Sequence, residues 1–459
     1  MMRLSLLPRC CAAVFGVGFL FLTALATRAA ISPGEILIGE MNCVACHSAS
    51  QQVLARLASR PSPRLTPAHA ARVTPQWMRA FLENPQATQP GTLMPDLLAG
   101  LDYAKRAEAA ESLTHYLIAL RGEDKTEPIG ASTAAINDGQ ALYHSVGCVT
   151  CHAPDELVPE KSNDADAEAE LDRLRQISVP LGALEKKYTV SALADFLEDP
   201  LKSRPGGRMP SLKLKPAEAR AIAMYLLRTQ VGKAEIDTTF LPYEGPPMRP
   251  VGDAMFAVDP GKAAHGKELF ASLNCAGCHQ VDGPGRTSKP LVQLNARQPG
   301  GCLATKPKEG VPKFAITDRQ RVVILAQLGS QAELEEALTP EQQITRTMTT
   351  LNCYACHSRE RRGGVEGLRR DYLTSVGETD LSEEGRIPPA LTGIGAKLRP
   401  EGIKSVLVEG GAVRLHMATR MPLYGEKNVG HLPALFEKAD VRPGAQPDRH
   451  RVERCRPCE

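Results

Sequence analysis

Cys43-Val-Ala-Cys46-His47 is the stretch around which the chain is organised, and its pattern occurs four times. Each copy has two cysteines separated by two residues, with a histidine directly after the second cysteine. The other copies are Cys148-Val-Thr-Cys151-His152, Cys275-Ala-Gly-Cys278-His279 and Cys353-Tyr-Ala-Cys356-His357. Zinc knuckles and thioredoxin-like redox pairs also use two cysteines at this spacing, but neither needs the histidine in every copy.

Repeated Cys-x-x-Cys-His units are the attachment signature of c-type haem. Two thiols at this spacing can each add to one vinyl group of the same porphyrin. The next residue then lies under the iron, where its imidazole becomes an axial ligand. The sequence therefore predicts four haem c groups, with the four motif histidines as iron ligands: His47, His152, His279 and His357.

Length and composition agree with several small domains built around a cofactor. The chain has 459 residues, and four signatures suggest four units of roughly 100 residues. Only 4% of the residues are aromatic, so each unit would have a thin core unless a porphyrin contributed apolar surface. The net charge of +3 gives no support for nucleic-acid binding.

The N-terminus has the pattern of an export signal. Arg3 and Arg9 precede an almost entirely apolar run over residues 12–25, and Ala24-Leu25-Ala26 offers a small-x-small cleavage site. The apolar run is short for a membrane span. We therefore expect residues 1–26 to be a cleaved signal peptide, after which no span remains, and the mature protein to be exported.

The units resemble one another outside the signature. A glycine lies nine residues before the first cysteine in three of them: Gly34, Gly139 and Gly266. A glycine with an apolar residue four positions later suits a short helix packed closely against another backbone. Amphipathic helices are predicted downstream over residues 107–120, 216–227 and 432–438.

A Met-Pro pair precedes each of these later helices. The pairs are Met94-Pro95, Met209-Pro210 and Met421-Pro422. A thioether on a loop that the following proline stiffens can face an imidazole across the iron, and such ligation raises the reduction potential. The alternative is that these methionines fill the core.

This layout resembles the class I cytochrome c family. The resemblance implies an all-α fold of four tandem cytochrome c-like domains, at residues 31–122, 133–230, 258–330 and 340–440. It implies that Met94, Met209 and Met421 are distal ligands of the first, second and fourth haems. It also implies haem attachment outside the bacterial cytoplasm, hence a periplasmic location. A Pro-rich linker at residues 241–257 is expected to divide the chain into two pairs of domains.

In this family a backbone carbonyl of a proline often accepts the second N–H of the ligand histidine. Pro180, Pro290 and Pro389, in the loops after the second, third and fourth motifs, are candidates. A plain turn proline is the alternative for each.

The third unit departs from the pattern, because Val311-Pro312 stands where the Met-Pro pair is expected and valine cannot ligate iron. Cys302 lies nearby, outside any signature, and is a candidate distal ligand of the third haem. The alternatives are a ligand among Lys306, Lys308, Lys313 and His265, an open iron, or an inert buried cysteine.

Two further segments fit the pattern poorly. Residues 359–370 form a basic insertion that we interpret as a solvated loop or helix, with a docking surface for a partner as the alternative. The tail at residues 441–459 ends Cys455-Arg-Pro-Cys458-Glu459, which lacks the histidine and is not counted as a fifth haem. A disulfide, a truncated further domain and a disordered end remain open for the tail.

The expected function is electron transfer between redox partner proteins, one acting as donor and one as acceptor. No catalytic residue is predicted, because no nucleophile, phosphate-binding or dinucleotide motif occurs. The rival hypothesis is a haem oxidoreductase that acts on a small inorganic or sulfur substrate at the third haem. In a third possibility the units are electron-transfer modules of a larger assembly.

Overall fold

The predicted all-α fold is confirmed by a computed structural model of the chain. It describes residues 31–441 except 66–71, 121–131, 158–165, 232–255, 280–287, 295, 298–299, 377–381 and 412. The predicted signal peptide and all but the first residue of the tail therefore lie outside the described residues, as does nearly all of the Pro-rich linker. In the described part, no helix has the length and apolar character needed to cross a membrane.

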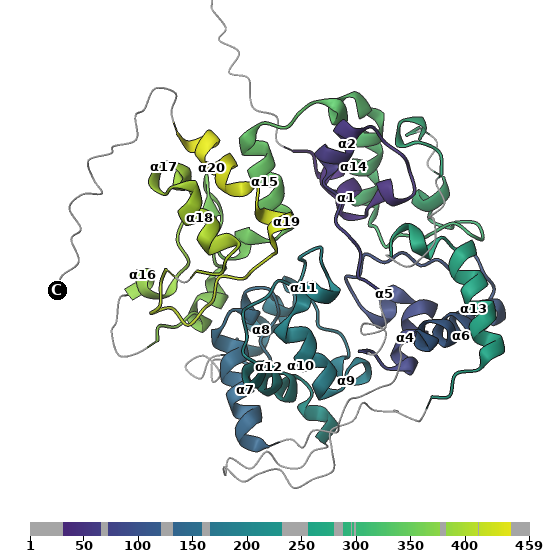
Figure 1. Cartoon of the computed structure of the whole chain (residues 1–459), viewed down its shortest axis with the longest axis horizontal. Coiled ribbons are helices and arrows are strands. Elements are labelled where there is room, and N and C mark those ends of the chain that lie inside the picture. The colour runs from purple at the N-terminus through teal and green to yellow at the C-terminus, as the bar shows by residue number, and fades with distance from the viewer. Residues whose placement is uncertain are drawn as a thin grey trace, which may run out of the picture. The chain divides into compact units, whose positions relative to one another are not determined.

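The helices form four groups, each around one Cys-x-x-Cys-His motif (Figure 1). We name each group after the histidine of its motif. Two groups are continuous in sequence. The His152 group contains α7 (Thr133–Ser145), η2 (Cys148–Thr150), α8 (Ala167–Gln176), α9 (Leu184–Lys187), α10 (Val190–Glu198), α11 (Pro200–Ser203), α12 (Pro216–Leu226) and η3 (Arg228–Val231).

The His357 group is also continuous and holds the only strands among the described residues. It contains α15 (Pro340–Thr350), η8 (Cys353–Ala355), β1 (Ser358–Arg359), β2 (Arg362–Gly363), α16 (Ser382–Arg386), α17 (Ile394–Lys397), α18 (Pro400–Leu407), α19 (Glu426–Val429) and α20 (Leu432–Asp440). The intervening η9 (Gly367–Tyr372) packs against the His152 group instead, whose core includes Tyr372. β1 and β2 pair antiparallel as a short hairpin directly after the motif.

The other two groups each combine two separate segments of the chain. The His47 group contains α1 (Pro33–Glu40), η1 (Cys43–Ala45), α2 (Gln51–Leu57), η5 (Leu291–Gln293), η6 (Gly301–Leu303), α14 (Asp318–Gly329) and η7 (Gln331–Glu335). The His279 group contains α4 (Pro75–Glu83), α5 (Pro85–Thr88), α6 (Tyr103–Ala119), α13 (Pro260–Ser272) and η4 (Cys275–Gly277). In Figure 1 the purple α1 and α2 lie beside the green α14, and α6 lies beside the later α13.

The four helices that lead into the motifs, and α6 after the first haem loop, begin at side-chain caps. Ser32 Oγ accepts a hydrogen bond from the backbone N–H of Glu35 at the start of α1, and Asp102 accepts one from Lys105 at the start of α6. A capping side chain satisfies a backbone donor that the helix itself leaves unpaired. The three predicted downstream helices are confirmed as α6, α12 and α20, within a few residues of the expected bounds.

The predicted close approach of three glycines to another backbone is also confirmed. A Cβ on Gly139 of α7 would lie 2.0 Å from the Ala221 carbonyl oxygen of α12, and both helices belong to the His152 group. A Cβ on Gly266 of α13 would lie 2.0 Å from the Ser112 carbonyl oxygen of α6. Only glycine permits these helix crossings, since any side chain would overlap the opposite backbone.

Candidate haem sites

Each motif folds into the same compact turn. The residue before the first cysteine has a positive φ, and the chain then makes one 3-10 turn through the motif. The histidine N–H donates to the carbonyl oxygen of the first cysteine at 3.0 Å in the first motif and 2.9 Å in the other three. The residues with positive φ are Asn42, Gly147, Asn274 and Asn352, which tolerate this region better than most residues do.

The four motif histidines share one hydrogen-bond arrangement. Nδ1 of each lies 2.7–2.9 Å from a backbone carbonyl oxygen. A carbonyl can only accept, so Nδ1 carries the hydrogen and Nε2 is left as the free lone pair that can ligate a metal. The pairs are His47 with Lys289, His152 with Val179, His279 with Pro63, and His357 with Pro389.

The proline predictions are right for one loop and wrong for the other two. The carbonyl of Pro389 binds His357 as expected. In the loops of Pro180 and Pro290 the accepting carbonyl belongs to the preceding residue. The loop of Pro290 moreover serves His47, because residues 288 and 291 also bond to the backbone of residues 46 and 48. Sequence reasoning missed Pro63, although it follows the first motif in a Pro-Ser-Pro loop.

All four motifs open onto one connected cavity of about 1780 Å³. Its lining includes the eight motif cysteines, the four motif histidines, and Met94, Met209, Met421 and Cys302. A typical small-molecule pocket occupies about 300–1,000 Å³, so this cavity has room for more than one large cofactor. Apolar walls with two thiols and one free imidazole nitrogen per motif fit covalent haem.

Burial makes the first thiol of every motif hard to ionise. It raises the pKa of Cys43, Cys148, Cys275 and Cys353 to about 12. An apolar site disfavours a thiolate but accommodates a neutral sulfur. The folded sites therefore suit thioether sulfurs, as covalent haem attachment would produce. They do not suit the reactive thiolates of a redox pair.

Two of the predicted distal methionines lie in loops that belong to their own motif's group. Met209 packs against the cluster that contains Cys148 and Val149. Met421 lies three residues before Tyr424, which is buried in the cluster that Cys353 joins. Met209 and Met421 both line the cavity, so both thioether sulfurs border the space that a haem would occupy.

The Met94 loop lies in the His279 group. Leu98, four residues after Met94, is buried in a cluster with Leu269 of α13 and with Leu273, which directly follows that helix and precedes Cys275 by two positions. The candidate ligand Cys302 lies in the His47 group instead. Its neighbour Leu303 packs against the cluster that includes Cys43 and Val44.

The four groups contact one another in two matched pairs through their motif cysteines. The Asn274 side-chain N–H lies 3.7 Å from Cys46 Sγ, and the Asn352 side-chain N–H lies 3.5 Å from Cys151 Sγ. In each pair the asparagine directly precedes the first cysteine of the later motif. The His47 group is thus adjacent to the His279 group, and the His152 group to the His357 group.

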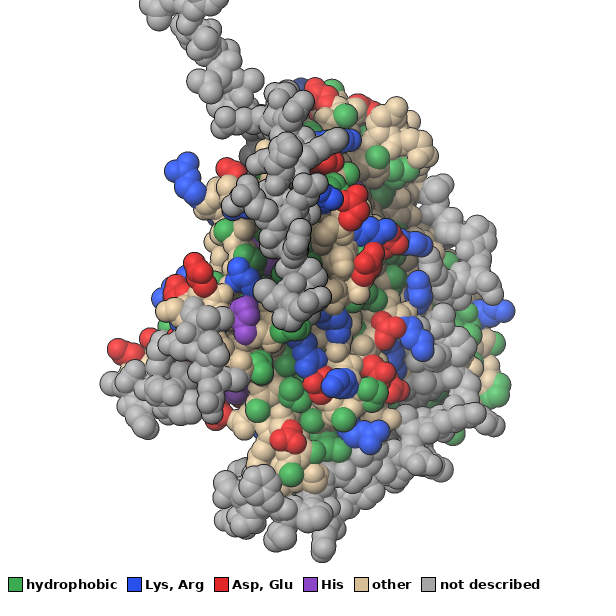
Figure 2. Space-filling view, turned by 60° about the vertical axis from the view of Figure 1, so that its left-hand side comes forward, with side chains coloured by type: hydrophobic (Ala, Val, Ile, Leu, Met, Phe, Trp, Pro, Cys, Tyr) green, Lys and Arg blue, Asp and Glu red, His purple; other side chains and the backbone are tan. Residues whose placement is uncertain are grey.

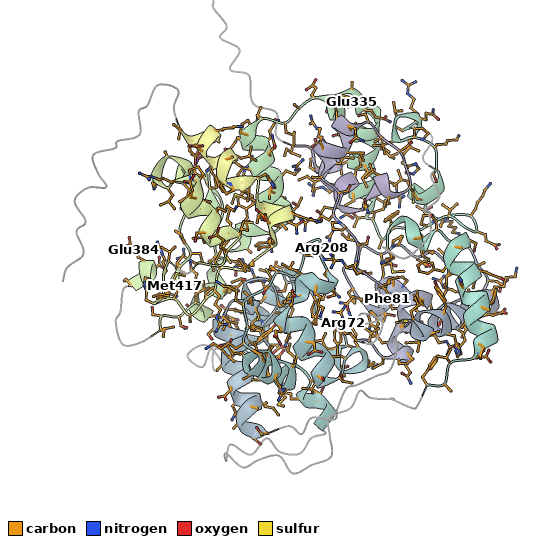
Figure 3. The ribbon with its side chains drawn as sticks, in the orientation of Figure 1. Arg72, Phe81, Arg208, Glu335, Glu384 and Met417 are labelled. Carbon is orange, nitrogen blue, oxygen red and sulfur yellow. The ribbon has the colours of Figure 1, made fainter. Side chains whose placement is uncertain are left out.

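Basic side chains line the cavity where the groups meet. They include Arg60, Arg72, Arg204, Arg208 and Lys187; Arg72 and Arg208 are labelled in Figure 3. Burial lowers the pKa of Arg60, Arg72 and Arg208 from the usual arginine value. Arg60 Nη2 and Arg72 Nε have no hydrogen-bond partner among the described residues. Arg60 and Arg208 also pair with Glu40, at 3.2 and 2.8 Å, so only part of this positive charge is neutralised. The buried N–H groups that remain unpaired beside the motifs fit the carboxylates that a haem carries.

The comparisons with known proteins agree with this donor set. The family model for cytochrome c matches residues 136–230 and 263–325. These two segments contain the second and third motifs and support a c-type cytochrome with covalently bound haem that transfers electrons. No curated protein and no solved structure matches the chain.

Proposed function

We propose that the protein is an exported, periplasmic c-type cytochrome that carries electrons between redox partner proteins through four covalent haems. One observation carries the proposal. At all four motifs a backbone carbonyl fixes Nδ1 of the histidine, so that Nε2 is free, and both cysteines of the motif face the same cavity.

Bound haem supplies one-electron chemistry, and this chain's residues set the conditions for it. The carbonyl bonds hold each imidazole in one tautomer and one orientation. Met209 and Met421 offer neutral sulfur ligands, which favour the reduced iron and raise the potential. The apolar lining limits access of water, so little rearranges when the charge of the iron changes.

The two contacts between an asparagine and a motif cysteine support electron passage within the chain. Each brings the side chain of the residue before one motif next to the sulfur of another motif, at Cys46 in one pair and at Cys151 in the other. Haems attached to these cysteines would therefore be held by adjacent motifs. Acidic and basic side chains are interspersed on the face shown in Figure 2, in keeping with a mixed surface for redox partners.

A second function has one observation in its favour. Val311 occupies the place of a distal methionine, so one iron lacks the usual sulfur ligand. That iron could bind a small inorganic or sulfur substrate, and the protein would then be a haem oxidoreductase with the other haems as its electron path.

The intact mass and the carbon monoxide response of the mature, haem-loaded protein test both functions. We expect the mass of the chain without its signal peptide plus four haems, and reversible reduction of all of them. Fewer covalent haems would contradict the tetrahaem proposal. Carbon monoxide binding by one reduced haem would favour the oxidoreductase, whereas no binding would favour a pure electron carrier.

A further inference from the structure

We propose that the first and third motifs exchange their distal segments: Met94 ligates the iron held by His279, and the iron held by His47 faces the Cys302–Val311 segment and has no methionine. This inference rests on the proposed haem-binding function. It moves the atypical iron from the third motif to the first.

The His279 site is built from residues of the first unit. α13 leads into the motif and packs along α6, with Gly266 against the backbone of Ser112. The Pro63 carbonyl accepts the Nδ1 hydrogen of His279 at 2.8 Å. In the sequence, Met94 lies between Pro63 and α6, on the loop that leads into α6.

The core around the His279 motif is also built with residues of the first unit. Phe270 of α13 lies five residues before Cys275 and is buried with Met78, Leu113 and Leu117 of the first unit. Cys275 packs against the same cluster. An adjoining cluster contains Leu98, four residues after Met94, with Leu269 and Leu273 packed against it, so the Met94 loop lies beside the His279 motif.

The His47 site is the reciprocal case. α1 packs against α14, and a Cβ on Gly34 would lie 2.1 Å from the Val323 carbonyl oxygen. The Lys289 carbonyl accepts the Nδ1 hydrogen of His47 at 2.7 Å. Leu303 and Phe314, on either side of Val311, pack against the cluster of Cys43.

The position of Val311 follows from a repeated backbone pairing. Asp96 pairs antiparallel with Lys313, and Ser211 pairs antiparallel with Leu423. Asp96, Ser211 and Leu423 each lie two positions after the methionine of a Met-Pro pair. Lys313 lies two positions after Val311, the valine of Val311-Pro312. Lys313 thus corresponds to Leu423, and Val311 corresponds to Met421. The segment with Val311 therefore occupies a distal position, but in the group of His47.

This assignment has a chemical consequence for the first haem. A haem held by His47 would face the segment with Val311 and the thiol of Cys302, where no methionine is available. The small ligand or substrate that the oxidoreductase alternative requires would bind at this iron. If Cys302 ligates instead, its anionic sulfur would give this haem the lowest potential of the set.

Removal of one haem at a time tests the exchange. One variant carries Cys43→Ala with Cys46→Ala, and the matched variant carries Cys275→Ala with Cys278→Ala. Mass spectrometry counts the haems. Proton NMR of the reduced protein counts iron-bound methionines by the methyl signals that the porphyrin ring current shifts upfield.

The two variants have opposite expected results. All three methionine signals of the parent should remain without the first haem, and one should disappear without the third. The reverse pattern would overturn the exchange. Absence of shifted methionine signals from the parent itself would overturn the proposed ligation, while a missing parent haem would overturn the proposed function.

Zero-length cross-linking of the unaltered protein gives a second test that does not depend on a variant's folding. Lys262 Nζ of α13 lies 3.1 Å from a carboxylate oxygen of Glu111 in α6. A carbodiimide should join these two side chains. Lys404 and Glu426, 3.6 Å apart within the His357 group, are the matched positive control. The control product without the Lys262–Glu111 product would contradict the exchange.

Discussion

Nδ1 of His279 lies 2.8 Å from the carbonyl oxygen of Pro63, which precedes it by 216 positions in the chain. The contact joins two haem units that the sequence places far apart. A binding site made of such distant segments cannot close until both are synthesised, and pairing distant segments slows folding. Two of the four sites thus depend on segments that span residues 33–335.

The helix crossing beside this contact predicts a destabilised variant. Gly266→Ala would place a methyl group 2.0 Å from the Ser112 carbonyl oxygen. We expect α13 and α6 to separate at a cost of about 1–3 kcal/mol, typical of overpacking. Thermal unfolding of the haem-loaded protein measures the change.

Gly329→Ala is the matched control for this substitution. Gly329 ends α14, and an added Cβ would have Ala296 Cβ as its nearest neighbour, at 3.9 Å. Its melting temperature should be unchanged or slightly higher, because alanine favours the helix. Equal losses in both variants would show that the close crossing is not the cause.

Met209→Ala should open the second haem to external ligands. Loss of the thioether removes a ligand that favours reduced iron, so the potential should fall and carbon monoxide should bind one more haem than in the parent. Spectroelectrochemistry and gas titration check this. Met224→Leu, in the core of α12, is the control and should change neither property. An unchanged potential in Met209→Ala would contradict ligation by Met209.

The contact between Glu218 and Arg420 predicts a response to acid. The Arg420 guanidinium donates to both carboxylate oxygens, at 2.8 and 2.6 Å. This bonding lowers the pKa of Glu218 from 4.5 to about 2. The ion pair therefore stabilises the fold fully above pH 4.5 and is lost as the pH falls from 4.5 through 2.

Because Arg420 directly precedes Met421, the fourth haem should report this loss. We expect acid to weaken methionine ligation there, measured by absorption and NMR between pH 5 and 2. Glu218→Gln should weaken it already at pH 5 and flatten the response over this interval. An identical acid response in the two proteins would rule out Glu218 as the titrating group.

Arg359 predicts a large loss of stability in the His357 group. Its side chain is only 1% exposed and binds Glu341 of α15 and Asp440 of α20, both at 2.7 Å. Arg359→Leu would leave two carboxylates without their cation, at about 3–5 kcal/mol. Arg175→Leu, at an exposed ion pair, should cost at most about 1 kcal/mol. Comparable melting temperatures would contradict a structural role for Arg359.

Several buried charges could not have been predicted from sequence. The basic insertion at residues 359–370 was expected to be solvated, and this is wrong for Arg359 and Arg369, which are 1% and 5% exposed. Arginine is a surface residue unless partners neutralise it. Those partners, including Glu341 and Asp440 for Arg359 and the carbonyl of Thr150 for Arg369, come from other segments.

The sequence by itself determined the local chemistry. The spacing of the Cys-x-x-Cys-His motifs, the glycines before them and the downstream amphipathic helices are short-range patterns. These patterns determine the backbone conformation of the few residues around them. For this reason the turns, the helices and the close glycine contacts were predictable. Only the tertiary structure decided which segment faces which motif. α1 and α13 both present a glycine face, and both α6 and α14 can accept it, so no local pattern separates the alternatives. The choice depends on the combined burial of residues such as Leu98 and Phe314, far along the chain from the motifs they cover.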